Sequence, residues 1–336
     1  MLLRPRSTRG LVQSVTRPLP VLSYTLRRLL YTVPIALGVT IFVFALIHLS
    51  GDPINAVVAP DATAETVAKL KKDYGFDKPL PLQYLLWLGK ALQGDFGYSI
   101  VNSRPVLATL LLAVPNTLIL ACCATLIGFT LGALLGGLAG FYQGRLVDKL
   151  ATGIGIAGVS VPHYWLGMVL VIIFAVELQW LPATGMGPGG SSGWEWDWLH
   201  IKHLVLPAVT LSVIPCGIIT RTVRATVAEI LSQEFVQALR AKGLLHGQVI
   251  RHVVKNAAPT VLAVMGLQLG YLLGGSILVE TVFNWPGTGF LLNDAIFRRD
   301  IPMLQGTILL LAMFFVVLNL IVDIVQTLVD PRMRRS

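Results

Sequence analysis

The chain has 336 residues, of which 54% are hydrophobic and only 13% are charged. Soluble domains average about 45–50% apolar and about 25% charged residues, so this composition excludes a soluble domain, a disordered chain and a coiled coil. The three cysteines lie in apolar segments and are too few for a disulfide framework. The net charge is +9, and the charged residues lie at the ends of apolar stretches. This placement favours a membrane protein over a nucleic-acid-binding one.

Six apolar stretches are long enough to cross a lipid bilayer as helices, which takes about 20 residues each. In chain order they are residues 29–49, 115–140, 163–181, 204–223, 259–279 and 304–329. The third stretch is open to lengthening by the Gly-rich residues 151–160. The sequence therefore predicts an all-α membrane protein with six transmembrane helices and both termini on one side.

The predicted spans divide the chain into five parts. We expect a basic cytoplasmic arm at residues 1–28, a first transmembrane helix at 29–49, an extracytoplasmic region at 50–105, a five-helix core at 106–329 with a cytoplasmic loop at 224–256, and a basic cytoplasmic tail at 330–336. Residues 61–74 and 81–92 of the extracytoplasmic region are predicted to be helical. A region of this size makes a thin core, so it should pack on the membrane domain.

The Lys and Arg distribution indicates the orientation, because short cytoplasmic loops carry an excess of these residues. With both termini inside, the cytoplasmic segments hold 17 of the 26 Lys and Arg residues. Six of the other nine fall in the long residues 50–105, and long segments translocate largely regardless of charge. The sequence thus predicts a multi-pass protein with both termini in the cytoplasm and an uncleaved first span.

Two spans carry glycine at every fourth position, which places the glycines on one helix face. Lipid gives helices no hydrophobic reason to associate, so faces of small residues mark close helix packing. We expect such packing, within the chain or with another subunit, at Gly128, Gly132, Gly136 and Gly140 of the second span and at Gly266, Gly270 and Gly274 of the fifth.

Polar side chains within the spans are few, and each is a functional hypothesis by default. Asn116, Gln268 and Asn319 are possible pathway residues, although hydrogen bonding between helices is the favoured interpretation. Asp323 is assigned a structural role near the cytoplasmic end of its span. No series of acidic or basic residues crosses the bilayer, so the sequence gives little support to a proton relay.

The cytoplasmic loop contains a predicted short helix at residues 233–242. Ser232 is its expected N-cap, Glu234 adds negative charge to the first turn, and Gly243 ends the helix. A helix of about ten residues is marginal alone in water, so it must dock on something. Its own membrane domain, a cytoplasmic partner and anionic lipid remain open alternatives.

Several motifs give the chain a family resemblance. The run QALRAKG at residues 237–243 resembles the cytoplasmic signature of bacterial ABC importer permeases, which forms a coupling helix in a groove of the ATPase subunit. GDFGYS at 94–99 followed by Arg104-Pro105, and ETVFNWPGTG at 280–289, are similar to permeases of the dipeptide, oligopeptide and nickel type. The chain departs from the signature at Gln237, where an acidic residue is common.

The resemblance implies a type I ABC importer permease fold with a small helical insertion after the first span. It implies the first permease subunit of a heterodimeric pair in the bacterial inner membrane. The implied partners are a second permease subunit, two ATP-binding subunits and an extracytoplasmic solute-binding protein. The implied coupling helix and its ATPase contacts comprise Glu234, Gln237, Ala238, Leu239, Arg240, Ala241, Lys242, Gly243 and Leu244.

The implied function is to form half of a path for peptides or a related small solute by alternating access. The sequence contains no G-x-x-x-x-G-K-[ST] motif, so we expect no cofactor in this chain, with ATP and Mg bound by the partner ATPases. We expect no metal site. We also expect no catalytic residue, and hence no enzymatic activity of this chain, since Ser160 and His163 lack a third orienting group. The alternative is an ion-coupled secondary transporter or channel, which needs acidic coupling sites at mid-membrane.

Overall fold

A computed structural model describes residues 21–49, 77–191 and 193–329, together with the single residues Thr63, Glu65, Ala68 and Lys72. The regular structure of these residues is helical, and the one β-bridge among them pairs Tyr98 with Pro105. The predicted all-α class is confirmed. Most of the predicted helix at 61–74, both terminal segments and the side chain of Asp323 lie outside the described residues.

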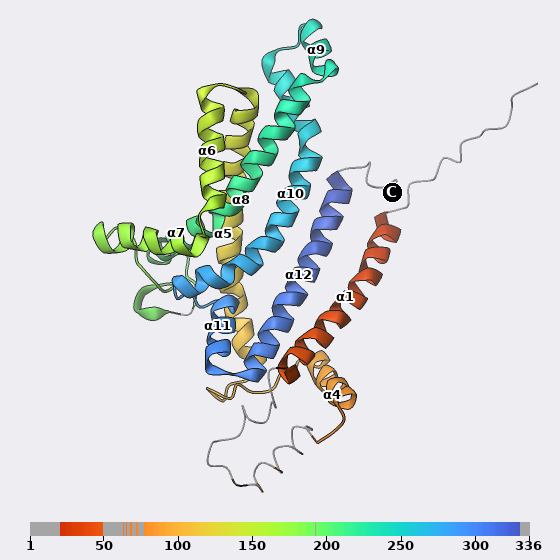
Figure 1. Cartoon of the computed structure of the whole chain (residues 1–336), viewed down its shortest axis with the longest axis vertical. Coiled ribbons are helices and arrows are strands. Elements are labelled where there is room, and N and C mark those ends of the chain that lie inside the picture. Colours follow the sequence, from red (N-terminus) through yellow and green to blue (C-terminus); the bar gives the residue numbers. More distant parts are fainter. Residues whose placement is uncertain are drawn as a thin grey trace, which may run out of the picture.

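Long helices run along the molecule, with short helices at both ends (Figure 1). The long helices are α1 (Val21–Leu49), α5 (Val106–Phe141), α8 (Trp198–Ser232), α10 (His246–Val282) and α12 (Ile301–Val329). α6 (Leu146–Ser160) packs beside α5 and α8. α9 (Glu234–Ala241) lies at one end of the bundle, and α4 (Leu80–Leu92) and α11 (Thr288–Arg298) lie at the other. The start of α1 and the end of α12 lie at the α9 end (Figure 1).

The helices extend beyond the predicted spans. α8 continues to Ser232 and α10 begins at His246, so most of the predicted cytoplasmic loop at 224–256 is helical. α5 likewise begins at Val106 and contains Pro115, which the prediction placed at the start of the span. The added ends of α8 and α10 are polar, so hydropathy does not mark them. Residues 106–114 of α5 are apolar, and the prediction left them out because it started the span at Pro115.

The third predicted span, residues 163–181, corresponds to a helical segment that ends at Glu177, and its lengthening by residues 151–160 into one straight helix is wrong. α6 meets the segment formed by α7 (His163–Leu170) and the π-helical η1 (Val171–Glu177) at 101°. Pro162 stands at the bend and forces Val161 into an extended conformation, with φ −92° and ψ 128°. α6, which includes most of the Gly-rich stretch, runs along α8, whereas α7 projects sideways (Figure 1).

The bends also change the count of spans. Among the described residues, three helices are long and apolar enough to cross a membrane, and five if each of two bent helix pairs forms one span. The described apolar part of α1, Leu30–Ala45, is shorter than the length required. The predicted number of six is therefore not reached by length and composition in the described part of the chain.

The glycine ladder of the second predicted span lies against α8. A Cβ on Gly128, Gly132, Gly136 or Gly140 would lie 2.5–2.9 Å from an atom of α8. For the first three glycines that atom is a backbone carbonyl oxygen, which belongs to Ser212, Cys216 or Thr220. Because real Cβ contacts are not this short, α5 and α8 can approach this closely only where α5 has no side chain.

The second ladder is not one continuous packing face within this chain. Gly266 is buried, and a Cβ on Gly270 would lie 2.8 Å from the ring of Phe315 on α12. Gly274 has no atom within 4 Å of a Cβ, so its face is open. Of the two alternatives for the ladders, packing within the chain or against another subunit, only the second remains possible at Gly274.

Buried apolar side chains form three clusters along the bundle. One lies at the α9 end between α8, α9 and α10, and includes Val236. A central one joins α5, α8 and α10 and includes Phe283 and Trp285. The third joins the start of α5 to α11 and α12 through Val106 and Ala295. The two ends of the bundle are thus separate packing units connected by the long helices.

The α5–α8 packing gives a direct test. We predict that Gly136→Ala lowers the thermal unfolding midpoint of the detergent-purified protein by several degrees, because overpacking a tight contact costs about 1–3 kcal/mol. Gly137→Ala is the matched control, since its Cβ would meet no atom within 4 Å. The control should be neutral or slightly stabilising, because alanine favours a helix. Equal midpoints for the two variants would contradict the packing.

Candidate functional site

α9 rests on an apolar cluster formed with the ends of α8 and α10. Val236 is fully buried in it, and Leu239 and Leu244 are partly buried against it. The buried members of this α9 cluster are Ile219, Val223, Val227, Ile230, Val236, Val249, Val253 and Ala257. The short helix therefore docks on its own membrane domain, which answers one of the alternatives left by the sequence.

The opposite face of α9 does not pack against the buried core of the described residues. Exposed side chains on and beside it are Glu234, Gln237, Ala238, Arg240, Ala241 and Lys242. α9 thus has one face fixed to the bundle and one face open for a partner at the end of the molecule (Figure 1).

The C-terminal end of α9 is closed by a Schellman motif. Gly243 adopts φ +80°, and its N–H donates to the carbonyl oxygen of Arg240 at 2.9 Å. The N–H of Leu244 donates to the carbonyl oxygen of Leu239 at 3.3 Å, and both side chains pack against the α9 cluster. This pattern is the one that glycine favours at the residue after a helix C-cap, as predicted for Gly243.

The predicted N-cap of α9 is wrong. Ser232 is the last residue of α8, and its hydroxyl donates to the carbonyl oxygen of Glu229 at 2.7 Å. Gln233 occupies the N-cap position without a side-chain cap bond. Ser232 is already satisfied within α8, because serine hydroxyls readily bond the backbone of the preceding turn.

An ion pair fastens α6 to α8 near the same end. Arg224 donates from Nε to Asp148 Oδ1 at 2.5 Å and from Nη2 to Oδ2 at 2.9 Å. The backbone N–H of Gly144 donates to the same carboxylate at 2.8 Å. Asp148 is buried, and a fork of this kind is a directional bond. From the sequence, Arg224 contributed only to the Lys and Arg count of the cytoplasmic loop, because this pairing joins residues 76 positions apart.

At the other end, the loop after α10 folds onto α5 through Asn116. The Asn116 amide Nδ2 donates to the carbonyl oxygen of Pro286 at 2.8 Å, and Trp285 Nε1 donates to the carbonyl oxygen of Asn116 at 3.0 Å. Trp285 is fully buried. Asn116 therefore bonds between elements, which was the favoured interpretation from the sequence.

A buried carboxylate, Glu280, serves α11 as a cap from outside the helix. Its Oε2 accepts the N–H groups of Gly289 at 2.7 Å and Phe290 at 3.0 Å. The first N–H groups of a helix have no partner within it, and a negative charge suits that end. A Cβ on Gly287 would overlap the Glu280 carboxylate, so the first glycine of the GTG run makes room for this cap.

The other polar span residues make no hydrogen bond between elements that the structure describes. Gln268 is largely buried, and its Oε1 finds no donor among the described residues. Asn319 is half-buried, and its amide donates to the carbonyl oxygen of Phe315 within α12. Neither residue lies with Asn116 at the α5–α11 junction.

The GDFGYS motif is tied to the start of α12. The Ser99 hydroxyl donates to Asp300 Oδ2, and the N–H of Ile100 donates to Asp300 Oδ1 at 3.2 Å. The carbonyl oxygen of Asp300 accepts the N–H of Leu304 in the first turn of α12. Gly94 and Gly97 have positive φ in the preceding turns. The motif thus joins segments 201 residues apart in the sequence.

Asp197 caps the N-terminus of α8. Its Oδ1 accepts the backbone N–H of His200 at 2.8 Å and also lies 2.6 Å from the His200 Nδ1. These bonds from His200 lower the pKa of the Asp197 carboxyl. Glu195, Asp197 and His200 lie close enough for a metal ion, with ligand atoms within 4.8 Å. Because Asp197 already accepts two bonds from His200, the group is accounted for as a helix cap.

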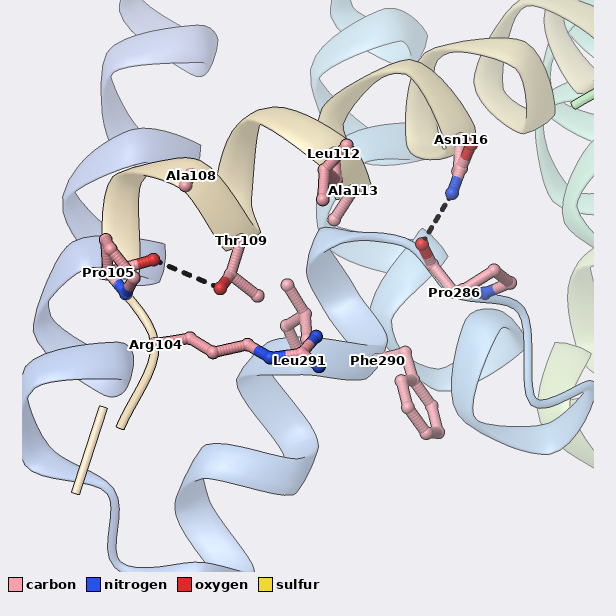
Figure 2. Close-up of a pocket in the computed structure, with 10 residues that line it drawn as sticks. All are labelled: Arg104, Pro105, Ala108, Thr109, Leu112, Ala113, Asn116, Pro286, Phe290 and Leu291. Atoms are coloured by element: carbon pink, nitrogen blue, oxygen red, sulfur yellow. Dashed lines mark hydrogen bonds between the residues drawn. The ribbon is translucent and has the colours of Figure 1, made fainter. Parts of the chain in front are cut away.

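A pocket of about 290 Å³ opens between the first turns of α5 and the start of α11 (Figure 2). Its apolar walls include Leu112, Phe290 and Leu291. Figure 2 shows Arg104 reaching below the first turn of α5 toward Leu291. The Asn116–Pro286 hydrogen bond lies at its inner edge.

Comparisons with known proteins agree with one another. Residues 128–335 match the family described as binding-protein-dependent transport system inner membrane component, and residues 21–121 match the N-terminal family of such membrane components. The chain is 36% identical over 315 residues to the glutathione transport system permease protein GsiC of Escherichia coli K12, which covers 93% of this chain and 99% of that protein. GsiC of Salmonella typhimurium LT2 gives the same identity and coverage.

A solved structure extends the likeness to the fold. The inward-facing MetNI methionine ABC transporter matches with a TM-score of 0.53 at 19% identity, over 66% of this chain and 96% of that chain. At this identity the likeness shows the fold alone.

We predict that Thr117→Val destabilises the α5–α11 junction. The Thr117 hydroxyl accepts the buried N–H of Thr288 at 2.8 Å, and loss of that acceptor costs about 1–3 kcal/mol. Thr109→Val is the matched control on the same helix, because the one partner of the Thr109 hydroxyl among the described residues is the Pro105 carbonyl at the start of that helix. Thermal unfolding in detergent measures both variants. An unfolding midpoint for Thr117→Val no lower than that of the control would contradict the assignment.

Proposed function

The chain belongs to the family of binding-protein-dependent transport system inner membrane components, and from this membership we propose how its parts serve transport. It is the permease component of an ABC importer and has the type I importer permease fold. The ion-coupled transporter or channel considered from the sequence is not proposed, because this family is powered through ABC partners.

We propose that α9 is the coupling helix. The observation that carries this proposal is its two-sided setting, with Val236 buried in the α9 cluster and Gln237, Arg240 and Lys242 exposed at the end of the bundle. A groove of an ATP-binding subunit would receive the exposed face. The Schellman motif at Gly243 would hold the helix at a fixed length and angle.

The proposed assembly has four kinds of component. This chain pairs with a second permease subunit as the first of a heterodimer, and the two enclose the path. Two ATP-binding subunits dock below, and an extracytoplasmic solute-binding protein docks above. ATP and Mg would bind in the partner subunits, which carry the hydrolysis, and this chain would contribute no catalysis.

The proposed substrate is glutathione or a similarly small peptide-like solute. The relatives with 36% identity are named glutathione transport permeases, and this substrate is carried over from them as a proposal. Alternating access then requires that closure of the ATPases moves α9 and opens the other end of the bundle. Hydrolysis would return the bundle to the inward-facing state.

The proposed orientation has the α9 end in the cytoplasm. The start of α1 and the end of α12 lie at that end (Figure 1), next to the basic terminal segments of the sequence. An excess of Lys and Arg marks cytoplasmic segments. Helix α4 and the loop between α4 and α5, which lie at the other end, would then face the binding protein.

We predict opposite labelling of the two ends. In a protein without its three native cysteines, Lys90→Cys on α4 should react with an impermeant thiol reagent in spheroplasts, because it lies at the outer end. Gly247→Cys at the start of α10 should react only after the membrane is opened. The reverse pattern would refute the orientation without affecting the family assignment.

We also predict that Gly243→Asp reaches the membrane at normal levels but loses ATPase binding. A side chain at φ +80° is strained by about 1 kcal/mol or more, which would misplace the end of α9. Gly247→Asp adds the same charge nearby on helical backbone where a Cβ meets no atom within 4 Å, and it should keep binding.

Co-purification of the ATPase and ATP-driven uptake of radiolabelled glutathione and tripeptides in proteoliposomes test both variants. If Gly243→Asp and Gly247→Asp behave alike, Gly243 is not a critical part of the coupling site and its assignment is wrong. If the wild-type complex shows no ATP-dependent uptake of any peptide-like solute, the proposed substrate class is wrong.

A further inference from the structure

The pocket between α5 and α11 has one charged side chain among its lining residues, Arg104. Arg104 is exposed, and no acidic side chain of the described chain forms an ion pair with it. The remaining lining is mostly aliphatic or aromatic, with Leu112, Phe290 and Leu291 as its largest side chains. A small concave site with a mostly apolar lining and a few polar groups is the usual form of a small-molecule site.

The other polar groups of the pocket are already used. The Thr109 hydroxyl donates to the carbonyl oxygen of Pro105, and the Asn116 amide donates to that of Pro286 (Figure 2). The guanidinium of Arg104 therefore supplies the donors that a ligand would meet. Guanidinium binds carboxylates through two parallel hydrogen bonds, so the pocket favours an anionic oxygen pair.

The walls of the pocket are held in place before any ligand arrives. Asn116 and Pro286 are joined directly, and Phe290 is the second residue whose N–H the buried Glu280 accepts. A preformed site loses less entropy on binding. Because Arg104 itself is exposed, the affinity should stay low, which suits a site from which a solute must leave again.

We propose that this pocket receives the carboxylate end of the transported solute, with Arg104 on the carboxylate and Leu112, Phe290 and Leu291 against the apolar part. The pocket lies at the end of the bundle opposite α9, where a binding protein would release its load (Figure 1). This inference rests on the proposed function as a peptide-type importer, and it names the chemical group by which this subunit recognises the solute.

The first test measures the charge preference of the pocket without transport. Ala108→Cys, in a protein lacking the native cysteines, places a thiol in the lining. Its reaction rates with an anionic and a cationic methanethiosulfonate are compared with Arg104 present and after Arg104→Gln. We expect the anionic-to-cationic rate ratio to fall about five-fold on removal of Arg104, as for one nearby screened charge. An unchanged ratio overturns the proposal.

The second test identifies the ligand. Trialanine and S-methylglutathione should slow modification of Ala108→Cys when Arg104 is present, and trialanine amide should not. The same rates are measured in nanodiscs of neutral lipid and in nanodiscs with phosphatidylglycerol. If only the anionic lipid protects the thiol, the pocket binds a lipid headgroup and the proposal is wrong.

The third test separates this inference from the proposed function. In proteoliposomes of the complete complex, Arg104→Gln should raise the KM for peptide uptake several-fold. Arg298→Gln is the control, because Arg298 is exposed on α11 and paired with Asp294 outside the pocket. Equal KM values for both variants refute the pocket alone, whereas absent wild-type uptake refutes the proposed substrate class.

Discussion

The close approach of α5 to α8 is the constraint on which the rest of the structure depends. Lipid does not drive helices together, so their contact needs small residues and complementary backbones. Because the glycines on α5 have no side chain, carbonyl oxygens of α8 can lie where a Cβ would otherwise clash with them. The Asp148–Arg224 fork adds α6 to this pair. The three helices thereby form one block that reaches from the α9 end to the opposite end of the bundle.

Each end of this block carries one of the proposed functional elements. α8 leads into α9, which the α9 cluster holds against α8 and α10, so a force on the exposed face of α9 acts on the whole block. At the other end, α5 carries Asn116 and Thr117, which bind the segment around Trp285 and Thr288. A movement of the block would therefore also move α11 and the pocket beside it. A permease needs such a connection if closure of its ATPases is to change access at the far side of the membrane.

The sequence predicted the features that depend on local chemistry. The glycine period, the left-handed Gly243 and the helical class follow from neighbouring residues. Hydropathy alone could not place the bend at Pro162, since apolar residues continue across it. It also could not reveal the Asp148–Arg224 pair or the capping of α11 by Glu280, because these contacts join separate elements. A carboxylate next to a long apolar run, as at Glu280, was the available signal for a buried partner.

The packing of α9 against α8 and α10 implies that α9 moves together with the α5–α6–α8 block. Pulsed electron paramagnetic resonance between spin labels at Lys149, near the start of α6, and Lys242, at the end of α9, measures this directly. The labelled complex must retain ATP-driven uptake. We expect the same distance distribution in the nucleotide-free and ATP-trapped transporter. A shift comparable to one helical turn, about 5.4 Å, would show that α9 pivots on its own and would contradict its coupling to the block.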